Sequence, residues 1–178
     1  MNMYFVALVA PDDINRQVLK WKTWMNEKFG CQVALRSPAH ITLIPPFWMK
    51  PESENNLVKH LQRFSEEITE FTIHLSGFSN FKPKVIFTDV EKNETLDSLK
   101  EKLFLFPSEE KFPFEKDDRP FHPHITIATR DLHKKSFYEA WDHFKEKQYT
   151  AEWIANGISL LRHNKKNWDV IHTSQFIQ

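Results

Sequence analysis

The sequence predicts an α+β fold, with antiparallel sheets and helices packed on the outside, in one domain made of two similar lobes. Short apolar runs rich in β-branched and aromatic residues alternate with stretches whose apolar residues recur every three or four positions. The order strand, helix, strand, helix, strand occurs twice. A length of 178 residues suits one domain, 1–178, with lobes of about 1–81 and 82–178.

The first lobe opens with a strand at 4–10 that stops at a proline, and a helix follows it. Apolar side chains at Ile14, Val18, Trp21 and Met25 mark this helix, which ends near Gly30. The remaining expected elements are a strand at about 32–36, a strand at 40–44 that stops at Pro45 and Pro46, a helix with the stripe 57, 61, 64 and 68, and a strand at 71–78.

The second lobe repeats this order after Pro83. We expect a strand at 84–90, a helix with Leu96, Leu99 and Leu103 that Asn93 caps, and a strand at 124–128. A helix around Phe137 to Phe144 and strands at about 149–162 and 168–176 complete it. Residues 107–120 carry three prolines and eight charges, which predicts a long surface loop, either a lid or a solvated connection.

Equivalent positions of the two lobes lie about 80 residues apart. Phe5 and Val85 are separated by 80 residues, His40 and His124 by 84, and Leu57 and Phe137 by 80. A period of this length that occurs twice indicates one domain with two related lobes rather than a solenoid of short repeats.

Composition narrows the function classes. The chain has 24 basic and 24 acidic residues, and a net charge of zero gives no general field for holding nucleic acid. One cysteine, Cys31, cannot form a disulfide framework, and we expect an inert buried thiol in a reducing compartment. The apolar run at the N-terminus is too short to span a bilayer. We therefore expect a soluble, cytoplasmic monomer with no membrane contact.

Each lobe contains one strand that begins with the pattern His, apolar residue, Thr, apolar residue. Because strand side chains alternate between faces, His40 and Thr42 share one face, as do His124 and Thr126. Two imidazoles and two hydroxyls at equivalent places of the repeat can converge on one central groove if a pseudo-twofold axis relates the lobes. This registered pair favours a catalytic site over two ordinary sheet residues.

The two motifs resemble those of the 2H phosphoesterases, the two-histidine family that includes 2′-5′ RNA ligases and RNA 2′,3′-cyclic phosphodiesterases. The resemblance covers nearly the whole chain and implies the family's bilobal pseudo-twofold fold. It implies hydrolysis of a 2′,3′-cyclic phosphate on an RNA end or a small nucleotide, and also 2′-5′ ligation. Two histidines with pKa values near 6.5 can act as general acid and base, and the threonine hydroxyls can bind the phosphate. No metal and no cofactor is expected.

The rim of the groove is where any substrate preference must arise. Phe47, Trp48 and Phe121 lie beside the motifs and are candidates for a nucleobase platform. Arg130 is a further rim candidate, although the related RNA ligases have an arginine one residue earlier, where this chain has Thr129.

Three alternatives stay open from the sequence. His122 and His124 could form a metal-binding pair with Asp117 and Asp118 as further ligands, which would make the protein a metal-dependent hydrolase. The scaffold could also be a non-catalytic module that binds RNA or nucleotides. Residues 162–167 form a basic turn, which is either a solvated hairpin or a contact for an RNA backbone.

Overall fold

The computed structural model describes residues 1–108, 110–115 and 119–178. It contains an eight-stranded sheet and four α-helices, with two short 3-10 helices. In chain order the elements are β1 (Asn2–Val9), α1 (Asp12–Phe29), the 3-10 helix Val33–Arg36, β2 (His40–Met49), the 3-10 helix Pro51–Ser53, α2 (Glu54–Ser65), β3 (Phe71–Phe81), β4 (Val85–Val90), α3 (Glu94–Leu105), β5 (His124–Ala128), α4 (Lys134–Phe144), β6 (Thr150–Ala155), β7 (Gly157–His163) and β8 (Trp168–Gln175).

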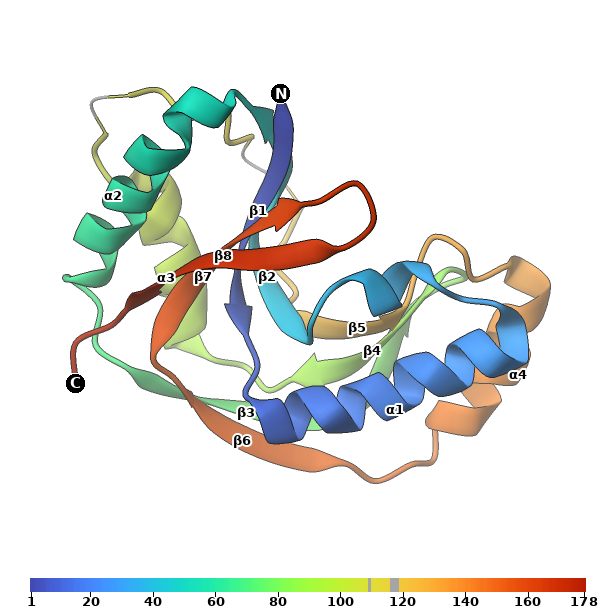
Figure 1. Ribbon diagram of the computed structural model, residues 1–178. Helices are drawn as coiled ribbons and strands as arrows, with labels where there is room; N and C mark the ends of the chain where they lie inside the picture. Colours follow the sequence, from blue (N-terminus) through green and yellow to red (C-terminus); the bar gives the residue numbers. More distant parts are fainter. Residues whose placement is uncertain (109, 116–118) are drawn as a thin grey trace.

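The strands form one curled antiparallel sheet in the order β6-β3-β4-β5-β2-β1-β7-β8 (Figure 1). The predicted α+β class, the antiparallel strands and the outer helices are therefore confirmed. At the centre of the sheet β2 pairs with β5, where Ile41 lies opposite Ile125. The two strands that begin with histidine are thus neighbours, although 84 residues separate their first residues.

Strands from the two predicted lobes interleave in this sheet. The strand β3, from the predicted first lobe, lies between β6 and β4, which belong to the predicted second lobe. The strands β7 and β8, also from the second lobe, follow β1 in the order β1-β7-β8. The division into lobes at 81 and 82 stays a prediction about the sequence repeat, while β5 and β2 are joined in the one sheet by the pair Ile41 and Ile125.

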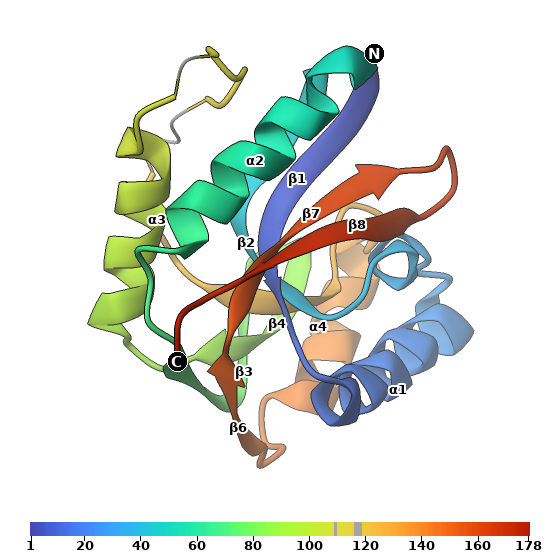
Figure 2. The ribbon, with the colours of Figure 1, turned by 60° about the vertical axis from the view of Figure 1, so that its left-hand side comes forward.

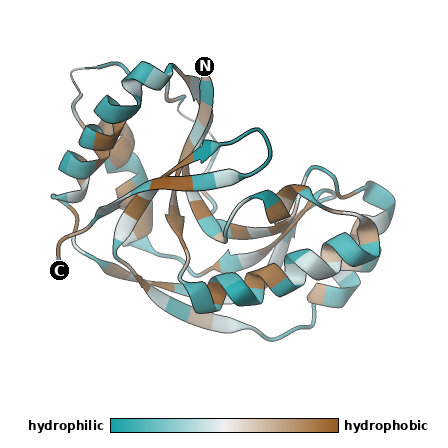
Figure 3. Cartoon of the chain, in the orientation of Figure 1, coloured by the Kyte–Doolittle hydropathy of each residue, from teal (hydrophilic) through white to brown (hydrophobic). Residues whose placement is uncertain are grey.

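Two pairs of helices cover the outer face. α2 and α3 lie side by side at one end of the molecule, and α1 and α4 lie at the other (Figures 1 and 2). Their apolar stripes meet the sheet in two clusters of buried side chains, while hydrophilic residues fill the rest of each helix (Figure 3). Asn93 caps α3 as expected, because its side-chain oxygen accepts a hydrogen bond from the Leu96 N–H.

Residues 33–36 form a 3-10 helix rather than the predicted strand. The Asp131 carboxylate accepts hydrogen bonds from the backbone N–H groups of Gln32 and Val33, at 2.6 and 2.9 Å. A carboxylate in that place satisfies the donors at the start of a helical turn. The sequence prediction was wrong because this cap lies about 100 residues away in the chain.

The strand β2 runs through both prolines instead of stopping before them. Its register against β1 shifts there, since Ile44 pairs with Val6 and Phe47 with Tyr4. Proline cannot donate to a ladder and is tolerated at such a bulge.

The predicted strand at 149–162 is two strands, β6 and β7, which break at Asn156 and pair with opposite halves of the sheet. Gly157 makes the close approach possible, because a Cβ atom at this position would lie 2.6 Å from the Ser174 carbonyl oxygen. The helix predicted to reach residue 68 ends at Ser65.

Candidate active site

The first histidine motif lies at the start of β2, on the face of the sheet opposite the helices. His40 and Thr42 are half-buried there, while Ile41 and Leu43 are buried in the core beneath the helices. The His40 ring packs against Phe5, with the ring centres 4.8 Å apart. Its Nδ1 lies 2.7 Å from the backbone carbonyl of Pro38. Since a carbonyl can only accept, Nδ1 carries the proton and Nε2 is left with a lone pair.

The second motif repeats this arrangement at the start of β5. His124 and Thr126 are half-buried, and Ile125 is buried on the opposite face. The His124 ring packs against Phe87 at 4.7 Å and Phe81 at 5.2 Å between ring centres. Its Nδ1 lies 2.7 Å from the backbone carbonyl of His122, again two residues before the histidine. Both motifs therefore fix the same imidazole tautomer by the same local bond.

The pairing of Ile41 with Ile125 relates the two motifs by a local twofold axis. One residue further along this antiparallel register in each direction, His40 lies across from Thr126 and Thr42 lies across from His124. Directly opposite residues on one face have Cβ atoms about 5 Å apart. The pairing therefore places the four predicted residues on one face of the sheet, at neighbouring positions of the two strands.

Both imidazoles have lowered pKa values. Burial lowers the pKa of His40 from 6.5 to about 4, the hydrogen bond to Pro38 opposes this, and the charges of Lys22 and His124 lower it further. Burial also lowers the pKa of His124, while the hydrogen bond to the His122 carbonyl and the nearby Asp89 act in the other direction. Near neutral pH, His40 is therefore an unprotonated imidazole that can accept a proton.

A cavity of about 350 Å³ opens beside Thr42 and His124, whereas His40 and Thr126 do not line it. Phe81 is 40% exposed, and the Lys100 ammonium lies 4.1 Å from the centre of the Phe121 ring. The cavity is lined by Thr42, Leu43, Pro45, Phe81, Lys100, Arg119, Pro120, Phe121, His122, Pro123 and His124. Aromatic and cationic side chains next to the motifs suit a nucleotide.

Of the predicted rim residues, the structure places only Phe121 at this cavity. Phe47 is 7% exposed and packs between Tyr4 and Phe114 in the core, so the expectation that it lies on the rim is corrected by its burial. Arg130 is exposed in the turn after β5 and does not line the cavity. Trp48 is exposed, but at a separate hollow with Ser53 and Phe112.

The other sequence hypotheses can be placed as well. In the described part of the chain no group of three or more His, Cys, Asp or Glu side chains is placed to hold a metal ion, and Asp117 and Asp118 lie outside that part. The imidazole of His122 instead contacts Asp89.

Burial raises the pKa of the Cys31 thiol to about 11, as expected of an inert cysteine. No helix of the described residues is long and apolar enough to cross a membrane.

The basic turn joins β7 and β8. Within it, the Arg162 guanidinium forms an ion pair with Glu54 at 2.8 Å, so this arginine has a structural partner. Lys165 and Lys166 are exposed. The exposed residues 164–167 fit either interpretation, a solvated hairpin or a contact for an RNA backbone, while the Arg162 guanidinium is paired with Glu54.

Sequence reasoning missed several residues around the motifs. Lys22 occupies a place in the buried stripe of α1 between Val18 and Met25, which is an unusual position for a lysine and a signal that could have been read. Asp89 is the penultimate residue of the apolar strand β4 and lies opposite His124 in the sheet. Lys100 and Phe81 come from distant segments and gave no local signal.

Comparisons with known proteins agree with this geometry. A family model described as the 2′-5′ RNA ligase superfamily matches residues 10–167. A protein of Geobacillus sp. (strain WCH70) named "Putative phosphoesterase" is 30% identical over 139 residues, which cover 76% of this chain and 77% of that protein. The RNA 2′,3′-cyclic phosphodiesterase of Bacillus subtilis (strain 168) is 28% identical over 143 residues, 71% of this chain and 70% of that protein.

Another similar protein, from Bacillus licheniformis and also named "Putative phosphoesterase", is 33% identical over 95 residues, and this match spans about half of its length, 53%. Among solved structures, E. coli LigT complexed with 3′-AMP superposes with a TM-score of 0.66 at 17% identity, covering 99% of both chains. At this identity the likeness establishes the fold, which is that of LigT.

Proposed function

The chain belongs to the 2′-5′ RNA ligase superfamily, and we propose that it is a metal-independent phosphoesterase that opens 2′,3′-cyclic phosphates with His40 and His124. One observation carries this proposal: both imidazoles are held as the same tautomer by a carbonyl two residues earlier, on either side of the pair Ile41 and Ile125. A module that only binds nucleotides has no need for two imidazoles with fixed tautomers.

The reaction needs one proton accepted and one donated. The oxygen of a water molecule attacks the phosphorus and loses a proton to one imidazole, and the bond from phosphorus to one ribose oxygen breaks. The other imidazole, in its protonated form, gives a proton to that oxygen. The product is a phosphate monoester beside a free ribose hydroxyl. The same two groups in exchanged roles would serve 2′-5′ ligation.

The surroundings of the two imidazoles suggest how they divide these roles. The buried Lys22 disfavours a second positive charge on His40, which suits His40 to accept the proton of water. Burial lowers the pKa of His124 as well, but Asp89 opposes this, which makes His124 the better suited of the two to donate. The anionic phosphate of a bound substrate would stabilise an imidazolium at His124 further.

Thr42 and Thr126 would bind the phosphate. Their hydroxyls lie on the same face as the imidazoles and can donate hydrogen bonds to the non-bridging oxygens, where negative charge grows in the transition state. The nucleoside would occupy the adjoining cavity, against Phe81 and Phe121. This arrangement supports an RNA end or a small nucleotide with a cyclic phosphate as the substrate, in line with the relative that is an RNA 2′,3′-cyclic phosphodiesterase.

The test incubates the purified protein with EDTA and either adenosine 2′,3′-cyclic monophosphate or a short RNA that ends in a cyclic phosphate. We expect conversion to the monoester in EDTA at the rate seen without it. Binding of the nucleotide without turnover would instead identify a non-catalytic module. Loss of turnover in EDTA, restored by a divalent metal, would identify a metal-dependent hydrolase.

A further inference from the structure

Lys22 is a buried charged side chain that the proposed reaction does not use. It is 4% exposed in α1, and among the described residues no carboxylate forms an ion pair with it. Its Nζ donates a hydrogen bond of 3.0 Å to the backbone carbonyl of Ser37. A methionine or leucine would fill the same stripe without the cost of burying an ammonium group. This cost indicates that the position serves something besides packing.

The bond of Lys22 belongs to an anchored segment, residues 37–39, directly before His40. Pro38 in this segment supplies the carbonyl that binds His40 Nδ1. The backbone N–H of Ala39 donates to the side chain of Asn15, also in α1, at 2.8 Å. α1 therefore holds the carbonyl that fixes the tautomer of His40.

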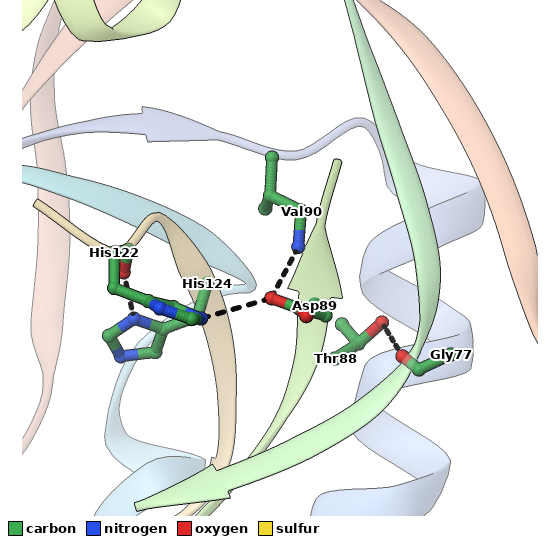
Figure 4. A network of polar contacts seen from close by, with 6 residues as sticks. All are labelled: Gly77, Thr88, Asp89, Val90, His122 and His124. Carbon is green, nitrogen blue, oxygen red and sulfur yellow. Dashed lines mark hydrogen bonds and ion pairs between the residues drawn. The ribbon is translucent and has the colours of Figure 1, made fainter. Parts of the chain in front are cut away.

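Asp89 anchors the segment before His124 in an equivalent way. The His122 Nε2–H donates to the Asp89 carboxylate at 3.1 Å, and the backbone carbonyl of the same His122 accepts the bond from His124 Nδ1 (Figure 4). Asp89 also lies opposite His124 in the pairing of β4 with β5. Phe81 and Phe87 pack against both imidazole rings and confine them.

We propose that Lys22 and Asp89 are a matched pair of positioning residues, each of which anchors the segment whose backbone carbonyl orients one of the two histidines, with opposite charges at the two positions. The proposal rests on the proposed function, because the histidines it concerns are those of the phosphoesterase reaction. Neither residue needs to touch the substrate. Each acts through the backbone segment that precedes its own histidine.

The opposite charges give the two histidines opposite electrostatic neighbours. Lys22 and His124 are the charged groups that act on His40, and both lower its pKa. His122 lowers and Asp89 raises the pKa of His124. Removal of the Lys22 charge should therefore raise the pKa of His40 more than that of His124, and removal of the Asp89 charge should lower the pKa of His124 more than that of His40.

The experiment measures imidazole ¹⁵N chemical shifts over pH for the whole protein, because these shifts report tautomer and pKa for each histidine without substrate. Lys22→Met removes both the donor and the charge, and Lys22→Gln removes only the charge. Asp89→Ala removes both the hydrogen-bond acceptor and the charge, and Asp89→Asn removes only the charge. We expect the Met and Ala variants to mix tautomers at the matching histidine only, and the Gln and Asn variants to shift its pKa while keeping the tautomer.

Turnover of a 2′,3′-cyclic nucleotide adds a second readout. Misplacement of a reacting group costs up to about 100-fold in rate, so we expect Lys22→Met and Asp89→Ala to lower kcat by about 10- to 100-fold with little change in KM. Lys145→Met and Asp142→Asn are matched controls, since these residues form an exposed ion pair on α4. They should change neither the shifts nor kcat.

The outcomes separate the two proposals. Absence of turnover in the wild-type protein would overturn the proposed function, while the ¹⁵N shifts would still decide the roles of Lys22 and Asp89. Folded Met and Ala variants in which the tautomers and pKa values of both histidines stay as in the wild type, or move together, would overturn the positioning roles. Should the Met or Ala variant fail to fold, the milder Gln and Asn variants decide by the pKa shift of one histidine.

Discussion

The starts of β2 and β5 share a local device but differ in what surrounds it. In both, the histidine binds the carbonyl two residues earlier, at 2.7 Å, and lies across from a threonine. At β2 a buried ammonium, Lys22, holds the preceding segment, whereas at β5 a carboxylate, Asp89, does so through His122. The common device fixes the tautomers, and the unlike surroundings give the two imidazoles different electrostatic neighbours, on which the proposed division of roles rests.

The largest expected effect comes from removing either imidazole. His40→Ala and His124→Ala should each lower kcat by about 10²- to 10⁴-fold, because each removes one proton-transfer group. Steady-state turnover of a 2′,3′-cyclic nucleotide measures this. His74→Ala is the control, since this histidine is exposed on β3, belongs to neither motif and contacts Glu152 of β6. Wild-type turnover in either motif variant would refute the assignment of both histidines.

Substitution of the two threonines tests whether both motifs contribute equally to phosphate binding, as the twofold relation between the motifs predicts. Thr42→Val and Thr126→Val keep the shape of the side chain and remove the hydroxyl, so each should lower kcat by about 10²-fold. Thr150→Val, at the exposed start of β6, is the matched control. An effect of one valine variant without the other would show that the two motifs bind the phosphate unequally.

The rim should respond through KM rather than kcat. Phe121 lines the cavity and offers its ring to a nucleobase, and stacking of one base is worth about 1–3 kcal/mol. Phe121→Ala is therefore expected to raise KM by about tenfold or more while kcat changes little. Arg130→Ala should change both constants by less than about twofold, because Arg130 does not line the cavity. An equal increase in KM for Phe121→Ala and Arg130→Ala would mean that part of the bound substrate extends out of the cavity to Arg130.

Stability should also depend on pH through His40. Its pKa is about 4 in the folded protein and about 6.5 in the unfolded chain, so the unfolded state binds a proton first as the pH falls. Above pH 6.5 this difference between the two states costs no stability. As the pH falls toward 4, it lowers the free energy of unfolding by up to about 3 kcal/mol. Urea denaturation at pH 7 and pH 5, for wild type and His40→Gln, measures it. An equal loss of stability in both proteins would place the effect elsewhere.

Much of the fold could be predicted from the sequence because the patterns that indicate its elements lie within short stretches of the chain. The stripes of α2 and α4, the cap at Asn93 and the strands at 4–10 and 124–128 each depend on neighbouring residues, and all were predicted. The 3-10 helix at 33–36 depends on Asp131, and the split of β6 from β7 depends on the close approach at Gly157. No local pattern contains these distant partners.

The residues of the two histidine motifs could be predicted for a different reason. The two motifs could be predicted because alternation along a strand places His40 with Thr42, and the repeat places the second pair in register. The anchors Lys22 and Asp89 lie 18 and 35 residues before their histidines, and only the packing of α1 and the pairing of β4 bring them close. Phe47 was misplaced because the bulge at the prolines of β2 turns its ring into the core.

The most direct test of the two-histidine reaction follows adenosine 2′,3′-cyclic monophosphate by ³¹P NMR in ¹⁸O-labelled water that contains EDTA. If His40 and His124 activate water and the leaving oxygen without a metal, the monoester appears and its phosphate carries one ¹⁸O atom. A cyclic phosphate that stays intact under these conditions, or that opens as fast with the His40→Ala protein as with the wild type, would contradict this mechanism.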